Sequence, residues 1–198
     1  EQLPVVFEWL KNMLVADKVV EEIQSSVKKI AGLVSAMKNF TYMDQGMDKQ
    51  FINIHQGIRD SLTVLTHKLK KSGVEVLEEY DTSLPKIKAL PGQLNQIWTN
   101  LLDNAIDALS GKDKPQIKIT TQKDGGCVEV IITDNGPGVP QEIQSRVFEP
   151  FFTTKEIGKG TGLGLDVVSQ IVRFHRGSVK LSSVPGKTSF SVSFPQNS

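Results

Sequence analysis

Apolar side chains recur at alternating steps of three and four residues along the N-terminal part of the chain. They are Val6, Trp9, Met13, Ala16, Val20, Ile23, Val27, Ile30, Val34 and Met37. A heptad seam of this length predicts one long helix in a coiled coil or helical bundle, because a helix that packs on its own globular domain seldom keeps so narrow a stripe. A partner helix is therefore expected. The polar stretch around Gly46 predicts a boundary between a helix over residues 1–45 and a globular domain over residues 46–198.

The first part of the globular region alternates between strand and helix patterns. The expected elements are a short strand over 50–53, a helix over 58–73 ended by Gly73, a strand over 74–80, a short apolar run over 87–90 and a helix over 92–109. Strands over 116–122 and 127–134 follow, joined by Asp124-Gly125-Gly126, a sequence typical of a hairpin turn.

Residues 135–162 show little periodicity and are too long for an ordinary connection, so they predict a functional lid. A helix over 163–175 and a hairpin over 178–183 and 188–194 complete the chain. The order of elements indicates an α+β fold: a two-layer sandwich of a mixed, mainly antiparallel sheet with three helices, preceded by the long heptad-patterned helix.

Composition excludes several classes of function. The 198 residues carry 23 basic and 22 acidic side chains, which gives no general attraction to nucleic acid or to an anionic membrane. Cys127 is the only cysteine, so a disulfide scaffold or a zinc site built on cysteines is not expected. No apolar run is long enough to span a membrane, and the start lacks a signal-peptide pattern. We expect a soluble, cytoplasmic piece of a longer protein.

Three polar side chains share one face of the expected helix over 92–109. Asn100, Asn104 and Asp107 are spaced by four and three residues beside apolar neighbours, so they border a cleft or a solvated helix face. An amide oxygen suits a magnesium ion that phosphates and water already coordinate, because it adds a hard ligand without further negative charge.

Asp134 ends an apolar strand and is followed by Gly136 and Gly138. Its carboxylate could accept a hydrogen bond from an exocyclic amine such as that of adenine, while the glycines let the backbone turn sharply. The same residues also suit a plain turn. A second glycine run, Gly158 to Leu165, matches neither the dinucleotide fingerprint nor the phosphate loop, but it enters a helix whose first amides could face a polyphosphate.

Together these segments resemble the Bergerat-fold ATPases, which include DNA gyrase, the heat-shock chaperone and mismatch-repair ATPases and the sensor histidine kinases. The segment from Gln96 to Ala108 is similar to the N box, Asp134 to Gly138 to the G1 box, Phe148 to Lys155 to the F box and Gly158 to Leu165 to the G2 box. The likeness runs over roughly residues 50 to 195, and the order and spacing of the four segments agree.

One position favours the histidine kinase branch. The members that hydrolyse ATP carry a glutamate one helical turn before the magnesium-binding asparagine, and Asn100 stands there. An amide cannot accept a proton from water, so the resemblance implies that ATP is held for transfer. It assigns catalysis to Asn100 and Asn104, magnesium binding to Asn104 and adenine recognition to Asp134. The implied nucleotide contacts are Asp107, Gly136, Gly138, Lys155, Lys159, Gly160, Thr161, Gly162, Leu163, Gly164, Leu165 and Thr188.

The resemblance implies ATP and Mg²⁺ as cofactors, a homodimer through the N-terminal helix and a response regulator as partner. It also implies a hairpin of two helices before the catalytic domain, of which only the second is here. His55 and His67 lack the acidic neighbour of the acceptor motif, and His175 ends a helix, so we do not expect this chain to phosphorylate itself. A serine-directed kinase or ATP hydrolase of the same fold and a nucleotide-free dimerisation module remain alternatives. Membrane anchoring of the parent protein stays open.

Overall fold

The computed structural model describes residues 7–9, 11–20, 23, 26–27, 48–156 and 160–196. The chain forms two compact units. One consists of Glu1–Gly46 with Phe151–Leu163, and the other of Met47–Pro150 with Gly164–Ser198. In the first unit, all described residues up to 27 are helical. The seam side chains Trp9, Met13, Val20 and Ile23 are half to two-thirds exposed, while Val6, Ile30, Val34 and Met37 lie outside the described residues. The partner helix stays a prediction.

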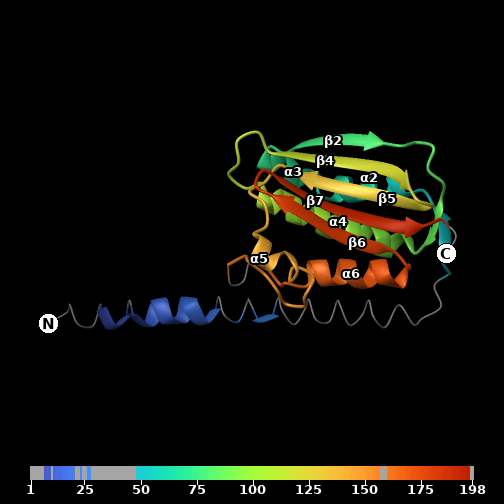
Figure 1. Ribbon diagram of the computed structural model, residues 1–198. Coiled ribbons are helices and arrows are strands. Elements are labelled where there is room, and N and C mark those ends of the chain that lie inside the picture. The colour runs from blue at the N-terminus through green and yellow to red at the C-terminus, as the bar shows by residue number, and fades with distance from the viewer. Residues whose placement is uncertain are drawn as a thin grey trace. The chain divides into compact units, whose positions relative to one another are not determined.

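A five-stranded sheet forms one layer of the second unit, in the order β2-β4-β5-β7-β6 (Figure 1). The strands are β2 (Glu75–Tyr80), β4 (Gln116–Asp124), β5 (Cys127–Asp134), β6 (Ser178–Val184) and β7 (Lys187–Pro195). Only β2 and β4 pair in parallel within this sheet, and its other neighbours are antiparallel. The expected mixed, mainly antiparallel sheet is confirmed.

Three helices form the second layer on one face of the sheet (Figure 1): α2 (Ile54–Val64), α4 (Pro91–Ala108) and α6 (Gly164–Phe174). Every second residue of β5 points into this layer, so that Val128, Val130, Ile132 and finally Asp134 are buried. The apolar stripe of α4, with Trp98 fully buried, packs onto them. The Asp134 carboxylate therefore lies buried at the edge of the core, at the end of β5.

The smaller elements differ in part from expectation. The single helix expected over 58–73 is two helices, α2 and α3 (Thr66–Ser72), because the backbone leaves helical geometry at the buried Leu65. Asn53 starts α2 earlier than the apolar pattern indicates, since its side chain accepts a hydrogen bond from the His55 backbone N–H at 3.0 Å. A short helix, α5 (Gln141–Gln144), lies in the expected lid, and β1 (Gln50–Ile52) pairs with β3 (Ile87–Ala89) in a separate ribbon.

Candidate nucleotide-binding site

Asp134 is a buried acid at the end of β5, with 4% of its surface exposed. Its Oδ1 atom accepts a hydrogen bond from the Gly136 backbone N–H at 2.8 Å. Burial raises the pKa of the Asp134 carboxyl above its usual value, and the hydrogen bond from Gly136 opposes that rise without cancelling it. A further donor would stabilise the charged carboxylate, which is what an amino group of a bound ligand would supply.

The turn after Asp134 contains two tightly packed glycines and is held by hydrogen bonds to side-chain hydroxyl groups. A Cβ atom on Gly136 would lie 2.6 Å from the Asp134 Oδ1 atom, and Gly138 has a φ of +88° with Val184 O 2.7 Å from the position of a Cβ. The Val139 backbone N–H donates to Ser183 Oγ at 2.8 Å, and Ser183 Oγ lies 2.9 Å from Thr188 Oγ1. Thr188 is buried and pairs in register with Asp134 across β5 and β7. The predicted residues Asp134, Gly136, Gly138 and Thr188 therefore lie together.

Helix α4 leads from this turn toward the start of α6. Near its end, the Ala108 carbonyl oxygen lies 3.4 Å from the Cβ position of Gly136, so this end borders the Asp134 turn. Two helical turns earlier, Asn100 donates from Nδ2 to the Gly164 carbonyl at 3.2 Å. The half-buried Asn104 lies between these points. At about 1.5 Å per residue, the two ends of this face are about 12 Å apart along the helix.

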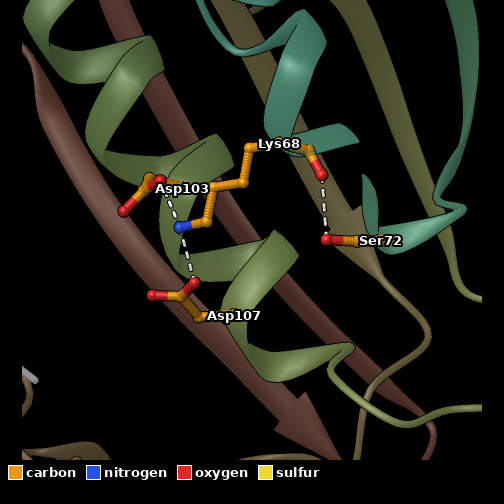
Figure 2. Close-up of polar contacts among 4 residues, drawn as sticks. All are labelled: Lys68, Ser72, Asp103 and Asp107. Atoms are coloured by element: carbon orange, nitrogen blue, oxygen red, sulfur yellow. Dashed lines mark hydrogen bonds and ion pairs between the residues drawn. The ribbon is translucent and has the colours of Figure 1, made fainter. Parts of the chain in front are cut away.

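The carboxylate of Asp107 points toward α3, where Lys68 binds it (Figure 2). The Lys68 Nζ atom lies 2.5 Å from Oδ1 of Asp107 and 2.5 Å from Oδ1 of Asp103, one helical turn apart on α4. Burial lowers the pKa of Lys68, but its hydrogen bonds to the two carboxylates outweigh that effect and raise the pKa overall. Asp103 and Asp107 are thus engaged by one ammonium group.

Two local turns lie among the described residues that precede α6. The Lys155 backbone N–H donates to Thr153 Oγ1 at 3.2 Å, and the Leu163 N–H donates to Thr161 Oγ1 at 3.3 Å. A Cβ on Gly160 would come within 2.7 Å of Thr153 Oγ1, and Gly162 has a φ of +67° against the Phe151 backbone. Lys159 lies outside the described residues. Gly164 and Leu165 form the first positions of α6.

The amide oxygens on α4 suit a magnesium ion that arrives bound to a polyphosphate better than a metal ion that the protein alone coordinates. In the described ranges, no three His, Cys, Asp or Glu side chains are placed to hold a metal ion. The amide oxygens of Asn100 and Asn104 would suit Mg²⁺ that a polyphosphate brings with most of its ligands. The buried acceptor Asp134 at the other end suits a base with an exocyclic amine.

Two contributions were missed from the sequence. Lys68 lies on a helix outside the four segments that resemble the family, although two aspartates four residues apart on α4 favour a nearby cation. Ser183 lies in an ordinary strand, and only its position opposite Thr188 in the β6–β7 hairpin reveals its role in holding the turn.

The family model of the "Histidine kinase-, DNA gyrase B-, and HSP90-like ATPase" matches residues 89–198, which is more than half of the chain. The chain belongs to this family. The matched residues of this histidine kinase-, DNA gyrase B- and HSP90-like ATPase include α4, the Asp134 turn, the glycine-rich segment and Thr188. The expected family, and the fold that it implies, are confirmed.

Within this family, the chain is similar to several histidine kinases. The sensory histidine kinase/phosphatase NtrB of Rhodobacter capsulatus is 32% identical over 93% of this chain, which covers 53% of NtrB. The catalytic domain of histidine kinase ThkA is 29% identical over 76% of this chain and 97% of that domain, with a TM-score of 0.68. A structure of ThkA with the response regulator protein TrrA aligns over 86% of this chain and 49% of that one, at 24% identity and a TM-score of 0.68. The chain thus spans about half the length of NtrB.

Among the residues that the structure describes, no helix is both long and apolar enough to cross a lipid bilayer.

Proposed function

We propose that this chain is the ATP-binding catalytic region of a two-component sensor histidine kinase. It would hold ATP and transfer the γ-phosphoryl group to a histidine on a dimerisation helix outside this sequence. The observation that carries the proposal is the arrangement along α4: a buried acceptor, Asp134, at one end and the amides of Asn104 and Asn100 toward the other. The likeness to NtrB and to the ThkA catalytic domain supports the same branch.

In this proposal Asp134 accepts a hydrogen bond from the adenine amine, and Thr188 lies beside it in register. Asn104 would hold Mg²⁺, and Asn100 and Asp107 would order its surroundings. When bound, the ion neutralises charge on the phosphate oxygens during transfer. Asn100 also fixes the start of α6 through its hydrogen bond to Gly164, so that the first amides of α6 keep one position for a polyphosphate.

The glycine-rich segment would cover the nucleotide. Lys155 or Lys159 would meet the phosphates, while Gly160, Thr161, Gly162 and Leu163 shape the backbone that approaches them. The turns centred on Thr153 and Thr161 support this role, because each gives the described residues beside it a defined conformation. Leu165 would pack at the first turn of α6 beside Gly164.

Hydrolysis is the less favoured use of such a site. A hydrolase needs a general base beside the attacking water, and Asn100 cannot accept a proton. The nearest carboxylates along α4, Asp103 and Asp107, are both ion-paired with Lys68, so neither is placed as a base for an attacking water. The phosphoryl group would then pass to an imidazole supplied from outside this chain.

We also propose the organisation of the longer protein. Residues 1–45 would be the second helix of a dimerisation and phosphotransfer hairpin, and residues 46–198 the catalytic domain. The exposed seam side chains of the described helix support a homodimer. Because a ThkA structure contains a response regulator, a response regulator is the proposed phosphate acceptor downstream. A cytoplasmic location follows from the use of ATP.

The test compares this chain with a longer version that carries the preceding histidine helix, each given Mg²⁺ and ATP labelled at the γ-phosphate. We expect acid-labile label on the longer protein only, and none after Asn104→Ala. Acid-stable label on serine, or release of phosphate without protein labelling, would establish the kinase or hydrolase alternatives instead. If calorimetry detects no ATP binding by the intact chain, the nucleotide-free dimerisation module is the correct description.

A further inference from the structure

A group of cations and aromatic rings lies where β1, β3 and the end of α6 meet. We call it the basic patch, and its members are Lys49, Phe51, Lys88, Phe174 and Arg176. Lys49 precedes β1, and its Nζ atom lies 5.0 Å from the centre of the Phe174 ring. Phe51 of β1 pairs in register with Lys88 of β3. The nucleotide-site residues described above are all elsewhere in the chain.

A buried histidine fixes this group in place. His175 is 1% exposed, its Nε2 atom accepts from the Leu90 backbone N–H at 3.1 Å, and its Nδ1 atom lies 2.9 Å from the Ile171 carbonyl oxygen. These contacts join the end of α6 to the residue that follows β3. Arg176, next along the chain from His175, is therefore held by the core at a place where its charge acts on Lys49.

Among the residues that the structure describes, no carboxylate forms an ion pair with the three cations of the basic patch. The ion pairs within residues 48–156 and 160–196 involve other residues, and none joins Lys49, Lys88 or Arg176 to a carboxylate. Burial lowers the pKa of Lys49, and the charges of Arg176 and Lys88 lower it further. Like charges gathered in this way cost electrostatic free energy, which an incoming set of carboxylates would recover.

Phe51 adds an apolar contact at the same place. Its side chain is 68% exposed on the short β1–β3 ribbon, and its partner in register, Lys88, is exposed too, as is Arg176. Exposed aromatic and arginine side chains are enriched at the centre of protein interfaces. A small anion would use the cations but would gain nothing from Phe51.

We propose that the basic patch docks a partner protein through an acidic segment that also carries apolar side chains. The carboxylates of the segment meet Lys49, Lys88 and Arg176, and one apolar side chain covers Phe51. A protein is favoured over nucleic acid because the chain as a whole has a net charge of only +1, and three cations are fewer than the roughly six to ten phosphate contacts of a typical nucleic-acid site. This docking is independent of ATP binding and of the proposed kinase activity.

The test uses a short fluorescein-labelled peptide of Asp, Glu and Leu residues, titrated with the full chain and followed by fluorescence anisotropy. We expect binding that weakens with added salt, a loss of about tenfold in affinity for Lys49→Gln combined with Arg176→Asn, and a several-fold loss for Phe51→Ser. Asparagine suits position 176 because the φ there is +56°. Unchanged thermal unfolding would show that each variant keeps its fold.

Matched controls lie on α2 and α3. Lys70→Gln combined with Lys71→Gln removes two exposed cations, and Val64→Ser removes a side chain that is 74% exposed. Both control variants should bind the peptide as the unchanged chain does. The proposal is overturned if the peptide does not bind or if the controls weaken it equally. It is also overturned if a single-stranded oligonucleotide or phosphatidylglycerol vesicles bind more tightly than the peptide and lose affinity with the same substitutions.

Discussion

The Asp134 carboxylate and the Gly136 backbone N–H form a 2.8 Å hydrogen bond within one turn, and each residue limits what the other position can be. A side chain at position 136 would begin 2.6 Å from the Asp134 Oδ1 atom, so only glycine leaves the contact intact. Burial still raises the pKa of the carboxyl despite this bond. Asp134 thus carries a free-energy cost in the ligand-free chain that a donor from a bound base would reduce.

Asp134→Asn should strongly weaken ATP binding without weakening the fold. The amide oxygen can still accept from Gly136, but the amide cannot act as a charged acceptor for the adenine amine. We expect at least a hundredfold loss of affinity in calorimetric titration with Mg²⁺ and ATP, on the order of 3 kcal/mol. Asp124→Asn, an exposed change at the end of β4, is the matched control and should bind ATP normally. Unchanged binding by Asp134→Asn would refute the role of this acid.

The same variant should be at least as stable as the unchanged chain at neutral pH. Because the folded-state pKa of Asp134 is raised, the native state binds more protons than the unfolded state just above pH 3.8, and stability falls as the pH rises through that region. Removing the acid removes this loss. Urea unfolding at pH 7 and at a pH below 3.8 should therefore favour Asp134→Asn only at pH 7. A variant less stable than the parent at pH 7 would contradict this account.

Gly138→Ala should destabilise the chain more than Gly164→Ala, because only position 138 lacks room for a side chain. Gly138 has a φ of +88°, and an added Cβ would lie 2.7 Å from Val184 O. An added Cβ on Gly164 would meet only the Asn100 amide, at 3.7 Å, which is ordinary contact. We expect Gly138→Ala to lower the free energy of unfolding by about 1–3 kcal/mol and Gly164→Ala by less than about 0.5 kcal/mol, measured by urea unfolding. Equal losses would argue against this reading of the turn.

The strands and main helices follow from local patterns, and so they could be predicted. The alternation in β5 and the stripe on α4 fix which faces are buried, and both agree with the structure. The break at Leu65 could not be predicted, because α2 and α3 have continuous helical composition and the buried position of Leu65 in the folded chain decides where they separate. Tertiary packing overrides propensity there.

The candidate site divides in the same way. Asp134 and its glycines form a local turn, so their contact is implied by adjacency in the sequence. The Lys68 contacts to α4 join residues 35 or more positions apart, and the sequence contains no signal for their distance. Likewise, the Asn100 bond to Gly164 depends on how α4 and α6 pack. The residue types indicated the chemistry of the site, but the hydrogen-bond and ion-pair partners of these residues could be identified only from the folded structure.

Lys68→Met should destabilise the chain modestly, and a second substitution should restore part of the lost stability. It leaves Asp103 and Asp107 as neighbouring like charges on α4. All three side chains are about a third or more exposed, so solvent screening limits the loss to about 0.5–1 kcal/mol. Adding Asp103→Asn should restore part of the stability, as measured by a double-mutant cycle of urea unfolding. Lys70→Met on the same helix is the control, and an additive cycle would rule out the shared ion pair.

Acid should weaken the fold through His175 before the carboxylates titrate. The ring lies between two backbone groups: the Leu90 N–H donates to Nε2, so the neutral ring must donate from Nδ1 to the Ile171 carbonyl. A proton on Nε2 would face the Leu90 N–H and break that bond. Burial, the largest cause, lowers the pKa of His175, and the nearby Lys49 charge lowers it further, while the hydrogen bond to Ile171 opposes both.

The unfolded chain therefore takes up a proton near pH 6.5 before the folded chain does, and the free energy of unfolding falls as the pH decreases from about 6.5 toward the lower folded value. His175→Gln should reduce this pH dependence, although it costs about 1–3 kcal/mol at pH 7 by leaving buried backbone groups without partners. His55, whose pKa burial also lowers, keeps part of the slope. His67→Gln, at an exposed position on α3, is the control. Urea unfolding between pH 5 and 8 measures the slopes, and an undiminished slope in His175→Gln would show that this histidine is not the group that titrates.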